Sequence, residues 1–139
     1  KKAHHDSGEL MREPKLTDGQ IEVILASGRW ELGGHTRTHA NLARVDDGTR
    51  RAEIAGARGS LGRRFGVAID SFAYPFGIFD ESHARMAREA GFIGAVTTDA
   101  GIPDAATNPM ATPRVKISGR DGMLAFRIRM RTGKRGLHK

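Results

Sequence analysis

The sequence has 139 residues, which is enough for one domain, because independent domains usually take about 100 to 200 residues. Hydrophobic residues make up 38% and charged residues 28%, a composition that is slightly polar for a globular domain but excludes a disordered chain. No cysteine is present, so disulfide frameworks, thiolate metal sites and cysteine nucleophiles are excluded. Any metal must be held by histidine and carboxylate side chains.

The charge is basic: 23 Lys and Arg face 16 Asp and Glu, for a net charge of +7. This balance favours anionic partners such as nucleic acid, acidic glycans or a cell-envelope surface. Basic residues crowd residues 127–139, where no acidic residue occurs. We interpret this stretch as a solvated tail, with a specific binding patch as the alternative.

Membrane insertion is not expected. No window approaches the roughly 18 consecutive apolar residues of a membrane span, and residues 1–6 lack the apolar run of a signal peptide. The printed sequence therefore predicts no transmembrane segment and no export signal.

The first predicted elements follow an irregular lead-in at residues 1–15. Thr17 and Gln20 form a capping-box pattern, which predicts a short helix that ends at Ser27-Gly28. Residues 30–32 alternate in polarity before a pair of glycines, which predicts a strand that turns sharply and delivers His35.

A longer helix is predicted between Asp46, a good capping residue, and Gly66. Its apolar stripe has helical spacing: Ile54, Ala57, Leu61 and Phe65. Residues 67–74 are β-branched and aromatic enough for a strand. Residues 74–77 (Tyr-Pro-Phe-Gly) must then be a loop, because proline has no N–H to donate to a sheet.

The second half of the sequence repeats this alternation. Asp80 predicts a helix through about Ala90, and residues 93–98 predict a strand. Residues 115–117 are a further strand candidate, and residues 123–130 predict a basic terminal helix. Alternating helices and strands indicate an α/β fold with parallel βαβ units, which places functional loops at the carboxyl ends of strands.

Two such loops are the candidates for a site: residues 35–39, which carry two histidines, and residues 74–77. In a parallel sheet both lie at the same rim. A helical turn or tight loop would bring His35 and His39 within about 6 Å, whereas a strand would separate them by roughly 13 Å. Two imidazoles suit Zn²⁺, Co²⁺ or Ni²⁺, and they require at least one further ligand. The alternative is that both are ordinary polar loop residues.

Four segments, in order and spacing, resemble the polysaccharide deacetylases, the family-four carbohydrate esterases with a NodB-homology domain. Residues 34–42 (Gly-His-Thr-Arg-Thr-His-Ala-Asn-Leu) resemble the metal-binding His-[Ser/Thr]-x-x-His motif of that family. Residues 71–80 (Ser-Phe-Ala-Tyr-Pro-Phe-Gly-Ile-Phe-Asp) are similar to its active-site wall in the poly-N-acetylglucosamine deacetylase branch. Residues 90–98 and 113–115 also fit that branch, and the likeness runs from about residue 16 to 118.

The resemblance implies a partial (β/α) barrel and a divalent metal held by His35 and His39, with Zn²⁺ expected and Co²⁺ or Ni²⁺ as alternatives. Such a metal polarises an amide carbonyl and lowers the pKa of a bound water toward 7, so an N-acetyl group could be hydrolysed to acetate and a free amine. The backbone N–H of Phe76 would stabilise the oxyanion, and Pro75 would fix that loop. Tyr74 and Phe76 would offer apolar surface to the sugar or the acetyl methyl, with loop packing as the alternative for both rings.

The family's Thr-Phe-Asp-Asp motif, which supplies the general base and the third metal ligand, has no match before His35. Residues 46–48 (Asp-Asp-Gly) lie after the histidines and are interpreted as a helix cap, and His138 is a poor substitute for the family's late histidine motif. Ala73 stands where many members place an Arg. Losing a general base typically costs about 10²- to 10⁴-fold in rate, so this absence predicts an inactive piece of a deacetylase domain as one outcome.

The predicted organisation is a lead-in at residues 1–15, a partial deacetylase domain at 16–118, and a basic helix or tail at 119–139. The expected partner is an N-acetylated polysaccharide, not nucleic acid, in an extracellular or cell-envelope setting implied by the family alone. An open sheet edge also predicts self-association. Two alternatives remain: a catalytically silent carbohydrate-binding module of the same fold, and a nucleic-acid binder that uses the basic tail.

Overall fold

The computed structural model describes residues 15–133. The chain divides into two compact units, Lys1–Glu31 and Leu32–Lys139. The lead-in prediction for residues 1–14, and the part of the predicted basic tail at residues 134–139, lie outside the described residues. Among the described helices, none combines the length and the apolar character needed to cross a bilayer.

The first unit contains one described helix, α2 (Asp18–Ala26). The Thr17 side chain accepts a hydrogen bond from the backbone N–H of Gln20 at 3.3 Å, and the Gln20 side chain accepts one from the N–H of Thr17 at 2.9 Å. These reciprocal bonds satisfy two of the amides that a helix start leaves unpaired. The predicted capping box and short helix are therefore confirmed.

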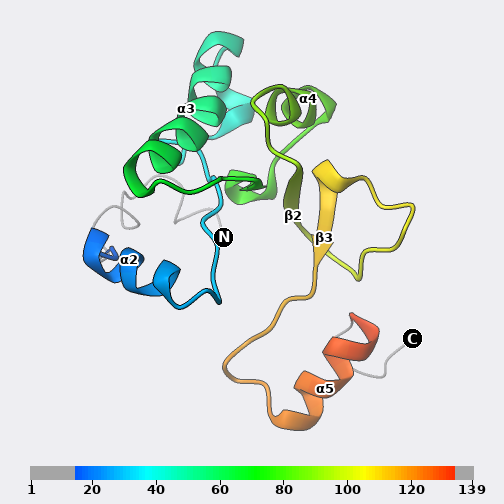
Figure 1. Cartoon of the computed structure of the whole chain (residues 1–139). Helices are drawn as coiled ribbons and strands as arrows, with labels where there is room; N and C mark the ends of the chain where they lie inside the picture. The colour runs from blue at the N-terminus through cyan, green and yellow to red at the C-terminus, as the bar shows by residue number, and fades with distance from the viewer. Residues whose placement is uncertain (1–14, 134–139) are drawn as a thin grey trace. The chain divides into compact units, whose positions relative to one another are not determined.

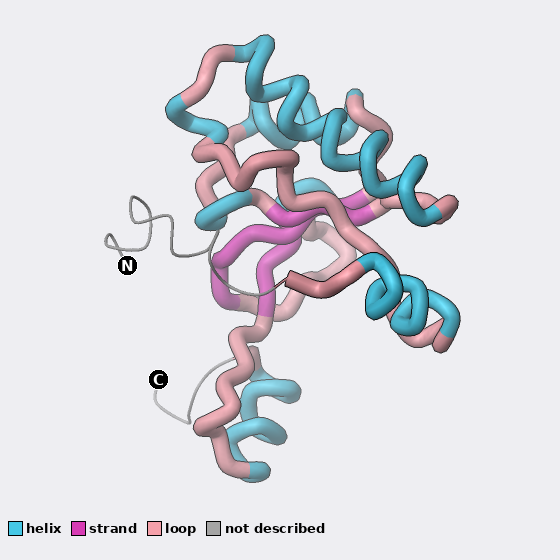
Figure 2. Tube along the Cα trace, turned by 90° about the vertical axis from the view of Figure 1, so that its left-hand side faces the viewer, coloured by secondary structure: helices cyan, strands magenta, loops and turns pink. Residues whose placement is uncertain are grey.

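The second unit is built around three parallel strands in the order β1 (Ser71–Ala73), β2 (Gly94–Ala100) and β3 (Thr112–Arg114) (Figure 1). The strands run side by side in the tube view (Figure 2). Helices α3 (Asp47–Phe65) and α4 (Glu81–Glu89) lie next to each other on one side of these strands. The predicted parallel α/β arrangement is confirmed.

Both helices begin where the sequence places a capping aspartate. Asp46 accepts from the N–H of Thr49 at 2.9 Å, and Asp80 accepts from the N–H of His83 at 3.0 Å. Gly66, with φ of 66°, ends α3 in the left-handed conformation that glycine adopts without steric cost. The predicted bounds of these two helices are thus confirmed.

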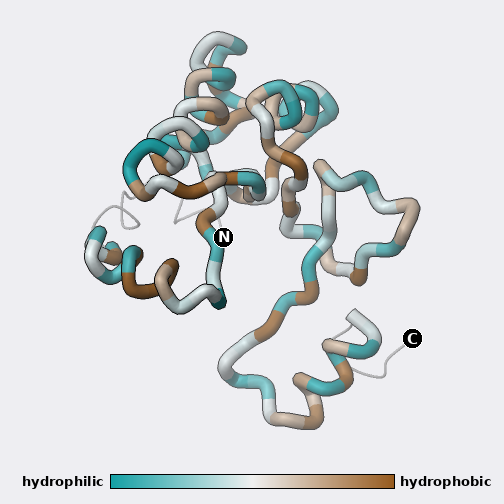
Figure 3. The backbone as a smooth tube through the Cα atoms, viewed as in Figure 1, coloured by the Kyte–Doolittle hydropathy of each residue, from teal (hydrophilic) through white to brown (hydrophobic). Residues whose placement is uncertain are grey.

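The core lies where the inner faces of α3 and α4 meet the sheet. Hydrophobic and hydrophilic positions are mixed along both helices (Figure 3), and the buried apolar ones are Ile54 and Ala57 in α3 and Ala84, Met86 and Ala87 in α4. The apolar residues are buried because their removal from water is the main favourable term in folding. The core cluster comprises Leu42, Ile54, Ile69, Phe72, Tyr74, Ala84, Met86, Ala87, Phe92, Ala95 and Met110.

Three strand predictions need correction. Residues 30–32 form no strand: Trp30 is 69% exposed, and only Gly34 reaches the sheet, through an isolated bridge to Phe72. The strand predicted at 67–74 shortens to β1, because Gly34 on one side and β2 on the other pair only with its last residues. The third strand is residues 112–114, not 115–117.

The position of β3 has a physical reason. Its middle residue, Pro113, has no N–H to donate to a ladder, but β3 lies at the edge of the described sheet, where proline is tolerated. Downstream, helix α5 (Met123–Thr132) confirms the predicted terminal helix. Its buried Arg129 pairs with Asp121 at 2.9 Å, which offsets the cost of burying that charge.

Candidate active site

The first site loop starts from Gly34, which is fixed beside β1. Its amide and its carbonyl each form a 2.8 Å hydrogen bond to β1, on either side of Phe72. A Cβ atom at position 34 would lie 2.7 Å from the Phe92 ring and 3.1 Å from the Phe72 ring. Only glycine lets the backbone approach so closely, and the approach places His35 at the carboxyl end of β1.

The imidazole of His35 is oriented by a main-chain carbonyl. Its Nδ1 atom lies 2.7 Å from the carbonyl oxygen of Ala73, and the side chain is exposed. Because a carbonyl oxygen can only accept, Nδ1 carries a hydrogen in this contact, which leaves Nε2 with the lone pair in the neutral form of the ring. This orientation by a backbone carbonyl is the arrangement typical of histidines that ligate a metal.

His39 returns to the same place after one tight turn. The ring centroids of His35 and His39 are 4.8 Å apart, and the ring of His39 contacts Phe76 from the second loop at 4.6 Å. The structure therefore brings together the two histidines and the phenylalanine that the sequence singles out. They form a row of three rings, contributed by two loops that both emerge at the end of β1.

The site concentrates backbone strain. Within the described chain, the non-glycine residues with positive φ are Thr36 (61°), His39 (60°) and Phe76 (62°). Each such residue costs of order 1–3 kcal/mol and persists only where its surroundings fix it. Strain of this kind clusters at functional sites, and here all three residues belong to the two site loops.

The sequence analysis missed Glu53, a residue of α3 that fixes the histidine loop. Glu53 is 8% exposed, and its carboxylate accepts hydrogen bonds from the N–H groups of Arg37 and Thr38 and from the Thr38 hydroxyl, all at 2.9 Å. The only signal in the sequence is a glutamate next to Ile54, within the apolar stripe. Nothing local to that position reveals a partner about fifteen residues earlier in the chain.

The second site loop is held by burial. Tyr74 is 2% exposed, its hydroxyl donates to the carbonyl of Met110 at 2.9 Å, and its ring stacks on Phe79 at 4.9 Å. Burial raises the pKa of Tyr74 to about 12. The ring thus packs in the core, which favours the loop-packing alternative for Tyr74 over a contact with substrate.

Pro75 is also buried and begins the short turn Pro75–Gly77. The N–H of Gly77 closes this turn onto the carbonyl of Tyr74 at 3.0 Å. Phe76 lies at the centre of the turn, half-buried, with its ring edge-on to His39. The turn therefore presents Phe76, rather than Tyr74, to the histidines.

The described residues supply only part of the ligand set that a divalent metal needs. Across residues 15–133, no cluster of three or more His, Asp or Glu side chains is suited to hold a metal ion. The two adjacent imidazoles, one with its tautomer fixed, suit Zn²⁺, Co²⁺ or Ni²⁺, but protein zinc sites have at least three protein ligands. The described residues therefore fit part of such a site.

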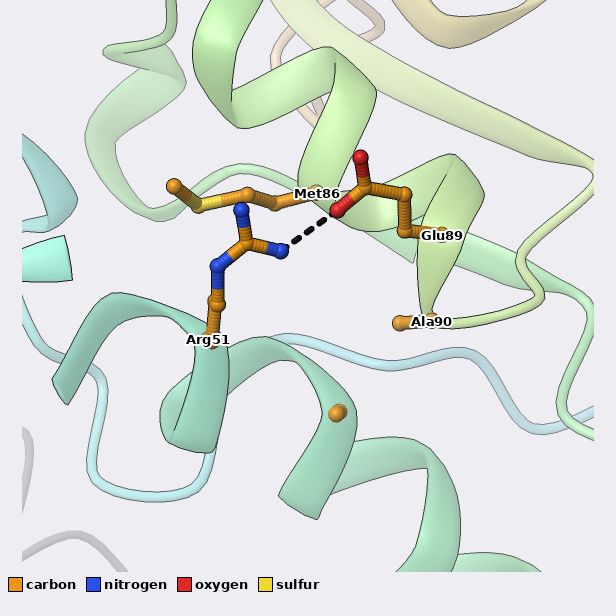
Figure 4. A pocket seen from close by; sticks show the side chains of 5 residues that line it. Arg51, Met86, Glu89 and Ala90 are labelled. Carbon is orange, nitrogen blue, oxygen red and sulfur yellow. Dashed lines mark hydrogen bonds and ion pairs between the residues drawn. The ribbon is translucent and has the colours of Figure 1, made fainter. Parts of the chain in front are cut away.

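A separate shallow groove lies between α3 and α4 (Figure 4). An ion pair between Arg51 and Glu89 crosses it, and the rest of its lining is apolar: Ala55, Met86 and Ala90. None of the candidate site residues lines this groove. Exposed ion pairs contribute little to stability, and the groove offers no nucleophile. The better candidate active site is therefore the row of His35, His39 and Phe76 at the end of β1, which we call the histidine rim.

Comparisons with known proteins show the family to which this chain belongs. The family model described as polysaccharide deacetylase matches residues 7–95, which include both site loops. The chain belongs to the polysaccharide deacetylase family. A search of curated proteins returned no match.

Solved structures show the same fold. A polysaccharide deacetylase from Bacillus cereus is 24% identical with a TM-score of 0.75, over 83% of this chain and 36% of that one. The deacetylase PplD from Streptococcus pyogenes, solved with acetate, is 22% identical with a TM-score of 0.73, over 81% of this chain and 49% of that one. IcaB from Ammonifex degensii is 24% identical with a TM-score of 0.62, over 73% and 47%.

The structural likeness, with TM-scores of 0.62 to 0.75, shows a part of the deacetylase (β/α) fold, and the predicted fold class is confirmed. The chain spans between 36% and 49% of the length of these three structures.

Proposed function

We propose that this chain carries the histidine side of an active site that removes N-acetyl groups from a polysaccharide of the N-acetylglucosamine type. The observation that carries the proposal is the row of three rings formed by His35, His39 and Phe76 at the end of β1. Family membership supports a polysaccharide as the substrate class. An extracellular or cell-envelope setting follows from that substrate.

His35 and His39 would hold a divalent metal, with Zn²⁺ expected and Co²⁺ or Ni²⁺ as alternatives. When bound, such an ion polarises a carbonyl and lowers the pKa of water. The contribution of the chain is orientation: the Ala73 carbonyl fixes the His35 tautomer, and the tight turn brings the His39 ring beside it. We assign no third ligand and no general base among residues 15–133.

The second loop would serve the acetyl group. We place the backbone N–H of Phe76 as the donor to the oxyanion that forms when water adds to the amide carbonyl. Pro75 holds this N–H in place because it is buried and begins the turn. The Phe76 ring offers apolar surface to the acetyl methyl. Cleavage of the amide C–N bond then yields acetate and a free amine on the sugar.

Acetate release tests this proposal. The protein, supplemented separately with Zn²⁺ and Co²⁺, is incubated with N-acetylglucosamine oligomers, and acetate is measured with time. We expect metal-dependent release that His35→Ala and His39→Ala each reduce by at least about 10²-fold, since each removes a group required by the reaction. Acetate release at the native rate in both variants would contradict the proposal.

A second candidate function is a catalytically silent carbohydrate-binding module of the same fold. The observation that favours it is the two-histidine donor set, because residues 15–133 supply no third ligand. Oligomer binding by calorimetry separates the two functions. Binding that survives His35→Ala, in a protein that releases no acetate with either metal, identifies the silent module.

A further inference from the structure

We propose that Glu53 is the positioning residue of the histidine rim: its carboxylate holds the 35–39 loop in the shape that makes the two imidazoles converge. The part of this inference that concerns metal affinity rests on the proposed function. The part that concerns imidazole orientation does not.

The first argument is the number and direction of the contacts. One carboxylate oxygen accepts both the Arg37 and the Thr38 N–H, and the other accepts the Thr38 hydroxyl. Two consecutive backbone amides aimed at one oxygen fix the peptide planes between His35 and His39. A carboxylate is well suited to this task, because it has acceptors only and about four lone-pair directions.

The second argument is strain. Thr36 and His39, on either side of the two held amides, have φ of 61° and 60°. Non-glycine residues remain in this region only when other contacts determine the backbone. Glu53 supplies those contacts from a rigid helix, since α3 runs from Asp47 to Phe65 and is capped at both ends.

A third observation shows that the loop docks on α3 at more than one point. A Cβ atom at Gly56, one turn after Glu53, would lie 2.3 Å from Cδ of Arg37. The aliphatic part of Arg37 therefore lies directly over the bare backbone of Gly56. Glu53 accepts hydrogen bonds from the loop amides, and Gly56 leaves space for the Arg37 side chain. The loop therefore packs against one face of α3.

Three substitutions separate the contribution of the Glu53 charge from that of its side-chain length. Glu53→Gln keeps the reach and an oxygen that can accept both backbone amides, but it removes the charge. Glu53→Asp keeps the charge but withdraws the carboxylate by one methylene. Glu53→Ala removes both. Glu89→Ala is the matched control, because it removes an exposed glutamate from the neighbouring helix α4, and its partner Arg51 lies outside the histidine rim.

The first readout needs no metal. Nitrogen-15 shifts of labelled imidazoles report which ring nitrogen carries hydrogen, and the native His35 is expected as the Nδ1–H tautomer. Glu53→Asp and Glu53→Ala should shift His35 and His39 toward the spectrum of solvent-exposed imidazole, while Glu53→Gln stays close to the native spectrum. Circular dichroism confirms that each variant is folded at the working temperature. Should Glu53→Ala not fold, the Asp and Gln pair carries the test.

The second readout is Zn²⁺ affinity by calorimetry. Losing a partner that orients a ligand typically weakens metal binding roughly 10- to 100-fold, which is the loss expected for Glu53→Asp and Glu53→Ala. Glu53→Gln should lose much less, and Glu89→Ala nothing. If native protein binds no Zn²⁺ but the imidazole spectra change as described, the proposed function fails and the positioning role stands. Native imidazole spectra in both Glu53→Asp and Glu53→Ala would overturn the positioning role. So would imidazole spectra that are closer to native in Glu53→Asp than in Glu53→Gln.

Discussion

The two loops that meet at His39 and Phe76 are held in place by different forces. The 35–39 loop is exposed for much of its length and is tied down by hydrogen bonds to one buried carboxylate, that of Glu53. The 74–77 loop is tied down by packing, with Tyr74 and Pro75 both in the core. Hydrogen bonds have strict directions, whereas apolar burial supplies free energy with little directional demand. We therefore expect damage to the first loop to alter the site, and damage to the second to unfold the protein.

The largest effect on stability is expected for Gly77→Ala in the 74–77 loop, which is held by packing. A Cβ atom at position 77 would lie 2.0 Å from the hydroxyl oxygen of Thr98, and Gly77 has φ of +69°. The left-handed conformation costs about 1–2 kcal/mol for alanine, and overpacking adds about 1–3 kcal/mol. The free energy of unfolding in urea should therefore fall by about 2–5 kcal/mol.

Gly66→Ala is the matched control for that prediction. Gly66 has nearly the same φ, +66°, but nothing lies within 4 Å of its Cβ position. Only the conformational cost remains, so the expected loss is about 1–2 kcal/mol. Equal losses in the two alanine variants would show that the 74–77 loop is not tightly packed against β2, and the contrast between the loops would fail.

A smaller loss of stability, but a larger change in the geometry of the two histidines, is expected for Thr38→Val in the 35–39 loop, which is held by hydrogen bonds. The substitution removes the hydroxyl that donates to Glu53 and leaves the two backbone hydrogen bonds. The free energy of unfolding should fall by about 1 kcal/mol, the usual net value of one hydrogen bond. Zn²⁺ affinity and the imidazole spectra of His35 and His39 should change as well.

Thr107→Val provides the comparison for that variant. Its hydroxyl also donates to a carboxylate, that of Asp104, at 2.8 Å, but the pair lies in the exposed segment between β2 and β3. We expect a comparable, small effect on stability and none on Zn²⁺ affinity. If Thr38→Val, like Thr107→Val, leaves the Zn²⁺ affinity and the imidazole spectra unchanged, the hydrogen bonds of the 35–39 loop do not control the orientation of His35 and His39.

A loss of stability similar to that of Thr38→Val at neutral pH, but with a clear dependence at alkaline pH and no effect on Zn²⁺ affinity, is expected for Tyr74→Phe. At pH 7 the variant loses one buried hydrogen bond, to the carbonyl of Met110, for about 1 kcal/mol. Burial raises the pKa of Tyr74 from 10.0 to about 12. The unfolded chain therefore ionises first, and the stabilising contribution of the neutral phenol is complete below pH 10 and is lost as the pH rises toward 12.

The difference in unfolding free energy between the native protein and Tyr74→Phe should therefore shrink across this window. Tyrosinate absorbance gives an independent reading, because Tyr74 is the only tyrosine in the sequence. Ionisation of the folded protein near pH 10 would show that Tyr74 is accessible to water and would favour the prediction that its ring contacts substrate.

The fold could be predicted from the sequence where the signals are local. Thr17, Asp46 and Asp80 cap helices as expected, since a cap depends on residues three positions apart. The strands were less predictable, because their bounds are set by partners distant in the chain. Residues 67–74 have the composition of a full strand, but only Ser71–Ala73 are paired.

The candidate site also combines features that local sequence signals predict with features that depend on distant partners. The His35 and His39 spacing and the preceding glycines predicted convergence of the two rings, and the structure places their centroids 4.8 Å apart. Glu53 could not be predicted, because its role depends on how α3 docks against a loop earlier in the chain. The burial of Tyr74 was equally hidden, since its hydroxyl finds its acceptor at Met110, far along the sequence.

The central claim, that the two loops form a rim that binds a divalent metal through His35 and His39, is tested most directly by Co²⁺ titration of the native protein and of His35→Ala and His39→Ala. Visible absorption of Co²⁺ reports its ligands and geometry, so the result does not depend on turnover. We predict saturable binding of one Co²⁺ per chain in the native protein and loss of that spectrum in each single variant, with the helical circular dichroism retained. An identical Co²⁺ spectrum and affinity in all three proteins would contradict the account.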